Sequence, residues 1–191
     1  MTAKKRNLQR QQEIEQGGST SSLSNILGAS YATLMDPVDS EFTNNITTIP
    51  LAPQESFGDY VTWQSPISIN GNHYYKSFSL KAGYFYSIYY HASAQNYDHI
   101  NDPNVGILLN NNFIPDSLIA APAVTNKPVL LSNTIIISSK DSNDVYQLCS
   151  FSKTIVTSVG LNTGNIALDL ASVAITVIGE ASTINQNSPR A

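Results

Sequence analysis

The chain has 191 residues, of which 13% are charged, and it carries a net charge of −4. This acidic balance argues against nucleic acid as a partner, because phosphate binding needs a basic face. The single cysteine, Cys149, cannot form an internal disulfide, so packing or assembly must supply the stability. No apolar run approaches the roughly 18 residues of a transmembrane helix, and we therefore expect no membrane insertion.

Residues 1–22 have the composition of a polar arm. A basic stretch leads into a Gln/Glu tract and then into the linker-like residues 17–22; the basic residues are Lys4, Lys5, Arg6 and Arg10. The segment lacks the apolar stretch of a secretory signal, so a surface location would need another route, such as deposition from inside a mother cell. We assign residues 1–45 to an N-terminal arm or connector.

Apolar residues recur at spacings of three and four from Leu23 to Met35, which predicts a short amphipathic helix. The helix would be capped near Ser21 or Ser22 and would end before Pro37, although a glycine in the middle weakens the pattern. An irregular loop that carries a few hydrophobic side chains is the alternative. If this arm docks onto another molecule, the docking residues are Leu23, Ile26, Leu27, Tyr31 and Leu34.

Residues 46–180 have the pattern of an all-β domain, and residues 181–191 form a polar tail. Many short strands separated by turn signals predict a sandwich or jelly roll. The lack of helix–strand alternation argues against a parallel α/β fold. Asn70-Gly71 predicts a hairpin with a type I′ turn, and Asn110-Asn111-Asn112 predicts a similar polar tip. The predicted strands are 46–51, 60–63, 67–69, 74–80, 84–92, 105–109, 113–119, 129–137, 145–150, 154–159, 166–170 and 173–178.

The strand predicted at 84–92 has large rings on both faces. One face holds Tyr84, Tyr86, Ile88 and Tyr90, and the other holds Phe85, Ser87, Tyr89 and His91. A strand of an antiparallel sheet normally leaves one face in water. We therefore predict that one face packs on a second sheet and the other on another subunit, and which face does which stays open. The residues predicted for this subunit contact are Tyr84, Tyr86, Tyr89 and Tyr90.

The residues that could carry chemistry do not form a recognisable catalytic or metal-binding pattern. Cys149 lies in a predicted strand with no histidine nearby in sequence, which favours a buried structural thiol. His73, His91 and His99 lack the spacing of a helical metal pair or of an HExxH motif. We therefore expect no enzyme activity, no catalytic residue, no metal site and no cofactor.

Two polar loops carry oxygen ligands of the kind that calcium prefers. The first holds Asp98, Asn101 and Asp102, and the second holds Asp141, Asn143 and Asp144. Neither has the spacing of an EF-hand, and Asx turns are the favoured interpretation, while calcium stays open. Trp63 and the tyrosines could form a sugar-binding platform, although core and interface aromatics are favoured. Asn45-Ile46-Thr47 is a formal N-glycosylation sequon.

Four stretches of the sequence carry a family resemblance, and they are Gly83–Ile88, Val105–Asn110, Phe113–Ser117 and Asn165–Ile178. Together they resemble the C-terminal domain of BclA-type collagen-like glycoproteins of bacterial spore surfaces, over about residues 55–180. The resemblance implies a tumour-necrosis-factor-like jelly roll, related in fold to complement globular heads, that forms tight trimers.

The chain departs from that family because it has no Gly-X-Y repeat and hence no collagen stalk. A jelly roll that follows a short arm is similar to the F-type endospore appendage subunits, which stack trimers into fibres through N-terminal connectors. This resemblance implies a homotrimeric subunit of a fibre on a cell or spore surface (the exosporium), assembled head-to-tail, with an anchor protein and a tip protein as further partners. The alternative is a receptor- or carbohydrate-binding trimeric knob of a phage or viral fibre or of a surface protein.

Overall fold

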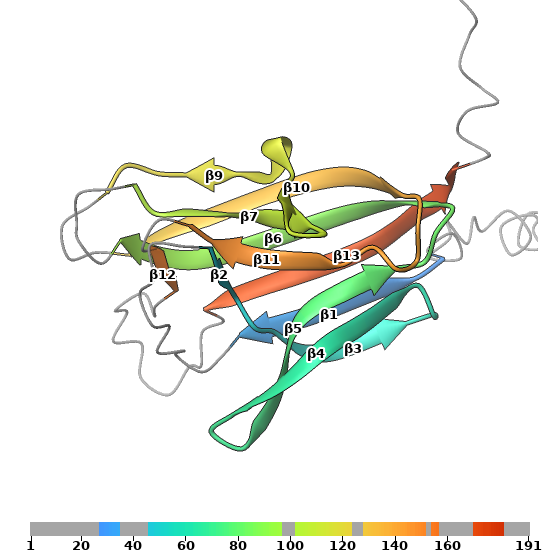
Figure 1. Cartoon of the computed structure of the whole chain (residues 1–191), viewed down its shortest axis with the longest axis horizontal. Helices are drawn as coiled ribbons and strands as arrows, with labels where there is room; N and C mark the ends of the chain where they lie inside the picture. Colours follow the sequence, from blue (N-terminus) through green and yellow to red (C-terminus); the bar gives the residue numbers. More distant parts are fainter. Residues whose placement is uncertain are drawn as a thin grey trace, which may run out of the picture.

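The chain folds into two antiparallel β-sheets that face each other (Figure 1). The structure is a computed structural model that describes residues 27–34, 46–96, 102–123, 128–151, 154–156 and 170–181. Sheet A has the strand order β10 (Val129–Ser139), β6 (Tyr84–Asn96), β13 (Ala171–Glu180), β1 (Ala29–Leu34) and β3 (Ala52–Phe57), with β12 (Thr154–Val156) also paired to β6.

Sheet B is built around the strand order β4 (Val61–Ile69), β5 (Asn72–Leu80), β11 (Tyr146–Ser150), β7 (Asn104–Leu109) and β8 (Asn112–Phe113). Two short strands complete it, because β2 (Thr47–Thr48) pairs with β11 and β9 (Ile119–Ala120) pairs with β7. Apart from the β4–β5 and β7–β8 hairpins, neighbouring strands of each sheet come from distant parts of the sequence, as in a jelly roll.

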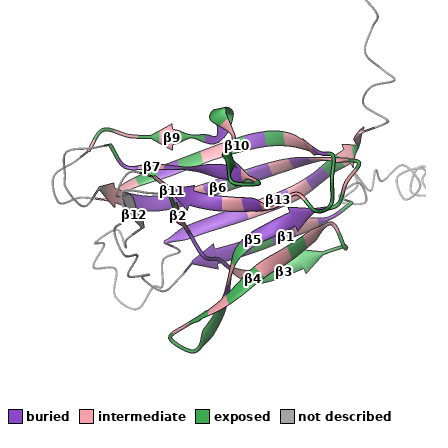
Figure 2. Cartoon of the chain, in the orientation of Figure 1, coloured by how far each residue is buried: buried purple, intermediate pink, exposed green. Residues whose placement is uncertain are grey.

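The strands of sheet A form because apolar side chains alternate along them and cover one face. Tyr86, Ile88 and Tyr90 of β6 are fully buried, and the same face of β13 holds Val173, Ile175 and Val177. Sheet B supplies the opposing layer, in which Phe78 and Tyr146 stack with their ring centroids 5.6 Å apart. The buried residues therefore lie between the two sheets (Figure 2).

Two predicted turns are present where the strands of sheet B reverse direction. Asn70 and Gly71 have φ values of 51° and 84°, so both central residues of the β4–β5 turn have the positive φ that a type I′ turn requires. Asn110 and Asn111, with φ values of 50° and 63°, form the polar tip between β7 and β8. The sequence predicted both positions correctly.

The helix predicted from Leu23 to Met35 is wrong in its described part. Residues 29–34 form β1, which pairs with β13 on one side and with β3 on the other. The backbone hydrogen bonds of two neighbouring strands outweigh a weak helical spacing, and they place Ala32 and Leu34 in the core at 0% and 1% exposure. The division at residue 45 therefore cuts off a strand that belongs to the jelly roll.

Gly28 shows why the chain in front of β1 runs extended along the sheet. A Cβ atom at this position would lie 2.3 Å from Cδ2 of Tyr60, so only glycine allows the backbone to approach this ring. The amide of Val177 donates a hydrogen bond to the Gly28 carbonyl. The residue that weakened the helix prediction is thus required for the strand.

The strand predicted at 113–119 is also wrong, because it breaks into three pieces. Residues 112–113 form β8, a 3₁₀ turn follows at Pro115–Ser117, and Ile119–Ala120 form β9. Proline has no backbone N–H to donate and starts the turn. The strand predicted at 166–170 and the tail from residue 182 lie outside the described residues.

The central position of β1 leads to a prediction about truncation. A chain that starts at Pro50 lacks the strand between β13 and β3, and we expect it to lose the cooperative thermal transition of the intact protein, followed by circular dichroism. A chain that lacks only residues 1–26 retains every described strand and should keep that transition. Cooperative unfolding of the shorter chain would contradict the central role of β1.

Candidate interaction surface

The outer face of sheet A, turned away from the core, gathers exposed apolar side chains from several strands. The strand register aligns Tyr31 of β1 with Ala174 of β13, and Ala174 with Tyr89 of β6. A second row of register partners on the same face runs from Phe57 of β3 through Ala29, Thr176 and Ser87 to Ile136 of β10. Residues on these rows belong to one face, because register partners in an antiparallel sheet point to the same side.

The most exposed apolar residues of the described chain lie on this face. Phe57, Leu130 and Ile136 are 63%, 67% and 69% exposed, and Tyr89 and Tyr31 are 41% and 36% exposed. Single exposed hydrophobic residues are normal on a soluble protein, but a group of them on one sheet face marks an interaction site. Leu130 and Ile136 also belong to β10, the strand at the edge of the sheet.

Charged residues are almost absent from the same face. Among its described outward-pointing residues, Glu55 of β3 carries the only carboxylate, and there is no lysine or arginine. Besides Leu130 and Ile136, the outward-facing positions of β10 are serine and threonine, namely Ser132, Thr134 and Ser138. A face with little charge loses little hydration when it is covered by another protein surface.

A hollow of about 220 Å³ lies in this face beside β3. It is lined by Tyr31, Phe57 and Glu55, and by small residues of β1 and β13 that include Ala29, Ala174 and Thr176. Small side chains between two large rings leave room for an apolar side chain of a partner. The hollow therefore belongs to the same candidate contact surface.

The end of the outer face near the start of β13 has a different character. Thr33, Ser172 and Ser93 are 2%, 1% and 2% exposed although they point away from the core, and Oγ of Ser172 lies 2.9 Å from Nδ1 of His91. The hydroxyls of Thr33 and Ser93 have no hydrogen-bond partner among the described residues. At this end the exposed apolar side chain is Leu130 of β10, the register partner of Ser93, and the other apolar residues of the contact surface lie toward the opposite end of the face.

The four tyrosines predicted for the subunit contact separate into two groups. Tyr86 and Tyr90 are 0% exposed in the chain's own core, so their prediction as contact residues is wrong. Tyr84 is half-buried and meets Tyr60 edge-on, with ring centroids 5.0 Å apart. Tyr89 is the member of the set that lies exposed on the outer face. Side chains of β6 alternate between its two faces. Which of the two sets points into the core depends on where the second sheet lies, and the sequence alone does not specify this.

The residues predicted for arm docking also separate. Leu34 is 1% exposed and packs in the core of its own chain, so it cannot dock onto another molecule. Tyr31 lies on the outer face of sheet A, and Leu27 is 40% exposed just before β1. Leu23 and Ile26 lie outside the described residues.

The sequence analysis missed the contributions of β3 and β10 to this surface. Ile135, Ile136 and Ile137 of β10 place apolar side chains on both faces of one strand, which is the signal that identified 84–92. The same reasoning applied to β10 would have found Ile136. Phe57 had no such signal, because its neighbours in β3 are polar.

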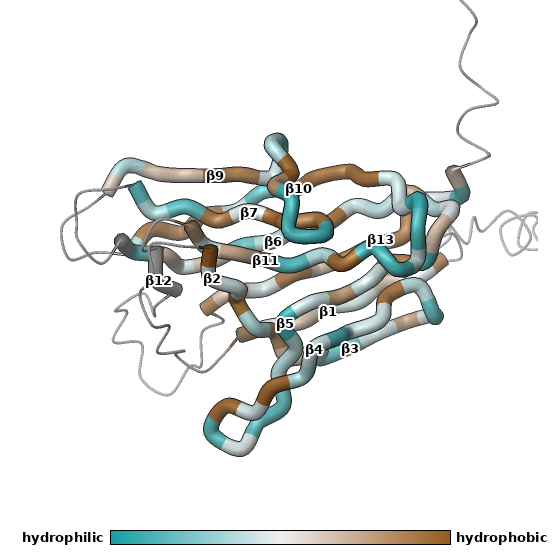
Figure 3. The backbone as a smooth tube through the Cα atoms, in the orientation of Figure 1, coloured by the Kyte–Doolittle hydropathy of each residue, from teal (hydrophilic) through white to brown (hydrophobic). Residues whose placement is uncertain are grey.

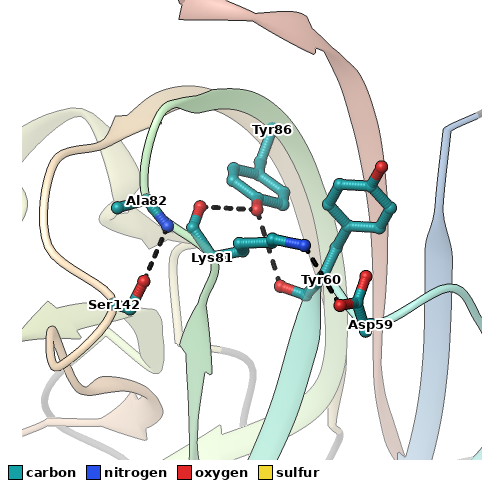
Figure 4. A network of polar contacts seen from close by, with 6 residues as sticks. All are labelled: Asp59, Tyr60, Lys81, Ala82, Tyr86 and Ser142. Carbon is teal, nitrogen blue, oxygen red and sulfur yellow. Dashed lines mark hydrogen bonds and ion pairs between the residues drawn. The ribbon is translucent and has the colours of Figure 1, made fainter.

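A polar network closes the end of the sandwich where β1 begins (Figure 4). Nζ of Lys81 lies 3.0 Å from Oδ2 of Asp59 and 5.1 Å from the ring centroid of Tyr60. The hydroxyl of Tyr86 donates to the carbonyl of Lys81 at 2.8 Å, and the amide of Ala82 donates to Oγ of Ser142. These contacts tie three loops together and serve the fold.

The protonation states in this network are those of a structural site. The hydrogen bond from Lys81 lowers the pKa of Asp59, and the same contact raises the pKa of Lys81. Burial raises the pKa of Tyr86 well above its usual value, so the phenol stays neutral and donates its hydrogen bond. The pKa shifts of Asp59, Lys81 and Tyr86 all move these groups further from titration at neutral pH.

The metal-ligand candidates do not meet one another in the described part of the chain. No group of three or more histidine, cysteine or acidic residues there could hold a metal ion. His73 is exposed on the β5 side of the hairpin, whereas His91 lies on the outer face of sheet A. His99, Asp98, Asn101 and Asn45 lie outside the described residues.

The second polar loop forms the Asx turn that the sequence favoured. Oδ1 of Asp141 accepts hydrogen bonds from the amide and side chain of Asn143 at 2.9 and 3.0 Å. Oδ1 of Asp144 accepts one from Asn110. In the other loop, Oδ1 of Asp102 accepts from the amide of Ala123. These carboxylates are therefore engaged in holding loops.

The aromatic platform suggested for Trp63 is absent, because this ring belongs to the interior of the sandwich. Nε1 of Trp63 donates to Oγ of Ser30 at 3.0 Å, and its ring centroid is 5.4 Å from that of Phe78. The favoured interpretation of Trp63 as a core aromatic is confirmed. Among the described residues, no helix is both long and apolar enough to cross a membrane.

Comparison with known proteins shows a likeness in fold. No protein-family model matches this chain, and no curated protein is significantly similar in sequence. Murine APRIL superposes with a TM-score of 0.52 at 8% identity, over 78% of this chain and 98% of that one. Pika GITRL gives a TM-score of 0.41 at 13% identity over 81% and 98% of the two chains. The PRD1 vertex protein P5 gives 0.42 at 11% identity over 81% and 99%.

The likeness to APRIL shows the fold of this chain. At 8% sequence identity it shows nothing about function. The two facing antiparallel sheets and their strand order belong to a tumour-necrosis-factor-like jelly-roll sandwich. The all-β jelly roll predicted from the sequence is confirmed.

Cys149 gives a direct test of the packing of sheet B. The thiol is 0% exposed, and burial raises its pKa to about 12, so the reactive thiolate is scarce in the folded protein. We expect an aqueous disulfide reagent to label the native thiol at least about 100-fold more slowly than the denatured chain. Labelling of the folded protein at the rate of an exposed thiol would contradict this burial.

Proposed function

We propose that the chain is a structural subunit that assembles into homotrimers through the outer face of sheet A, and that these trimers polymerise into a surface fibre. The single observation that carries the trimer is the apolar surface formed by Tyr31, Phe57, Tyr89, Leu130 and Ile136, on a face where Glu55 is the only described carboxylate. The chain acts as a building block, and we propose no enzymatic role for it.

This surface has two different parts, a broad sheet face and an edge strand, and their combination favours a trimer. The sheet face around Tyr31 and Tyr89 is broad, whereas Leu130 and Ile136 lie along the edge strand β10. When the edge of one copy packs on the face of the next, the contact joins two unlike patches, and it closes into a ring when the rotation is 120°. The resemblance to BclA-type trimeric domains supports this choice.

The fibre part of the proposal rests on the N-terminal segment and on the resemblance to endospore appendage subunits. A segment of linker composition leads to the apolar residues Leu23, Ile26 and Leu27, which precede β1. Burial of these three side chains in a neighbouring trimer contributes about 4.5 to 9 kcal/mol before the cost of ordering the segment. Three such segments act together at each joint, which raises their effective concentration.

The proposed location is a cell or spore surface such as the exosporium, where an anchor protein and a tip protein would complete the fibre. A receptor- or carbohydrate-binding knob on the same fold is the second candidate. The hollow beside Phe57 favours this alternative only if it stays open in the assembled trimer, because a covered hollow cannot bind a ligand.

The trimer can be tested with single lysine substitutions on the outer face of sheet A. We expect Tyr89→Lys and Ile136→Lys each to shift the protein from trimer to monomer at micromolar concentration, measured by light scattering. Each trimer would bury three uncompensated charges, and such burial is strongly unfavourable. Ile46→Lys is the matched control, because Ile46 is 49% exposed but precedes β2 of sheet B. Trimers that persist with either face variant would contradict the proposed contact.

The fibre can be tested without disturbing the jelly roll by a deletion that ends before Leu27. We expect removal of residues 1–26 to abolish filaments in electron micrographs and to leave trimers intact, because every described strand is retained. Joint replacement of Leu23, Ile26 and Leu27 by serine should act in the same way.

A matched control for that deletion replaces Lys4, Lys5, Arg6 and Arg10 by serine. Docking through apolar side chains predicts that these variants still form filaments and that added salt shortens them little. Filaments of normal length without residues 1–26 would overturn the connector role, and salt-dependent loss with the basic variants would assign the joint to charge instead.

A further inference from the structure

The outermost strand of sheet B has a free backbone edge. In the described structure β4 pairs only with β5, over nine residues from Val61 to Ile69. Its other side therefore presents N–H and C=O groups that no described strand satisfies. Such an edge can accept an added strand from another chain.

This edge lacks the charged side chains by which many proteins prevent such pairing. Charged side chains and proline usually protect an exposed edge. The edge strand β3 of sheet A carries both, with Pro53 and Glu55. By contrast β4 contains no charged residue, and it is interrupted only in its middle, at Ser65, whose φ is 57°, and at Pro66. The uncharged edge of β10 belongs to the trimer surface already proposed, which leaves β4 without an assigned partner.

The edge is also held away from the body of the sandwich. The hairpin formed by β4 and β5 projects from the two sheets (Figure 1). β5 pairs with β11 only at Phe78, and toward the tip only Tyr75 is bridged to Leu51. Thr62, Pro66 and Ser68 are exposed along β4, whereas Ile67 and Ile69 are partly buried. Apolar patches at the hairpin are visible in Figure 3.

The hairpin leads away from the start of β1 and projects from the sandwich (Figure 1). Gly28 lies against Tyr60, which directly precedes β4. From Val61 to Ile69 the strand then extends about 27 Å, at about 3.4 Å per residue. Subunits stacked head-to-tail therefore bring the N-terminal segment of one copy toward the hairpin of the next.

We propose that the free edge of β4 accepts residues 23–27 of a second copy as an added antiparallel or parallel strand. This inference rests on the proposed fibre function and names its acceptor. The occupant is chosen because Leu-Ser-Asn-Ile-Leu carries no charge and directly precedes a strand. Residues 23–26 directly precede Leu27 and reach about 14 Å beyond it when extended, so the start of β1 in one copy must lie beside the hairpin of the next. Backbone hydrogen bonds hold the added strand, and Leu23, Ile26 and Leu27 provide the selective contacts.

The test places lysine on the edge and leaves the trimer surface unchanged. We expect Thr62→Lys/Ser68→Lys to shorten filaments at least tenfold in electron micrographs and to leave trimers intact by light scattering. The matched control is His73→Lys, because His73 is the register partner of Ser68 and is exposed on the paired strand β5. Normal filaments in the β4 variant would overturn the assignment of the acceptor.

A disulfide trap gives an independent readout in the full-length chain with Cys149→Ser. Asn25→Cys is combined with Thr62→Cys or with Ser68→Cys, one near each end of β4, because the direction of the added strand is open, and we expect one of the two pairs to cross-link copies and give a ladder on a non-reducing gel. Asn25→Cys with Gln54→Cys is the control, because Gln54 is exposed on the other edge strand, β3. Cross-linking only through Gln54 would overturn the inference and name β3 as the acceptor. Absence of filaments in the unsubstituted protein would instead contradict the fibre function itself.

Discussion

The structure depends on one strand, β6, that carries large side chains on both of its faces. Tyr86, Ile88 and Tyr90 fill the space between the sheets, and β6 pairs with β10 and β13 on its two sides. Sheet B of the same chain covers the inner face of β6. The rings on the outer face therefore lie outside the chain's own core. The exposure of Tyr89 and its neighbours is therefore a direct consequence of how the sandwich closes.

The fold was predictable where one signal dominated a segment, and it was not where two signals competed. Strands such as β6 and β13 alternate apolar side chains over many residues, so their type and position follow from the sequence. In β1, six residues with Ala32 and Leu34 as their inward anchors satisfy helical spacing and strand alternation equally. The choice between them comes from the backbone pairing with β13 and β3, which is a tertiary effect.

The candidate surface was predictable in kind but not in its membership. The ring-rich segment indicated that a second partner is needed, yet parity alone does not tell which of Tyr89 and Tyr90 points outward. That outcome depends on where sheet B lies. Phe57 could not be found from local sequence at all, because it joins the surface only through the pairing of Ala29 with β3.

The two uncharged edge strands, β10 and β4, are suited to different kinds of contact between copies of the chain. β10 adjoins the apolar face of its own sheet, so an edge-to-face contact satisfies both surfaces at once and can close into a ring. β4 lies in the other sheet, on a projecting hairpin that adjoins no comparable apolar face. In the proposed fibre, the contact through β4 is made by a segment that reaches across from another copy. Such a contact joins unlike surfaces without a ring closure, and it can repeat along a fibre.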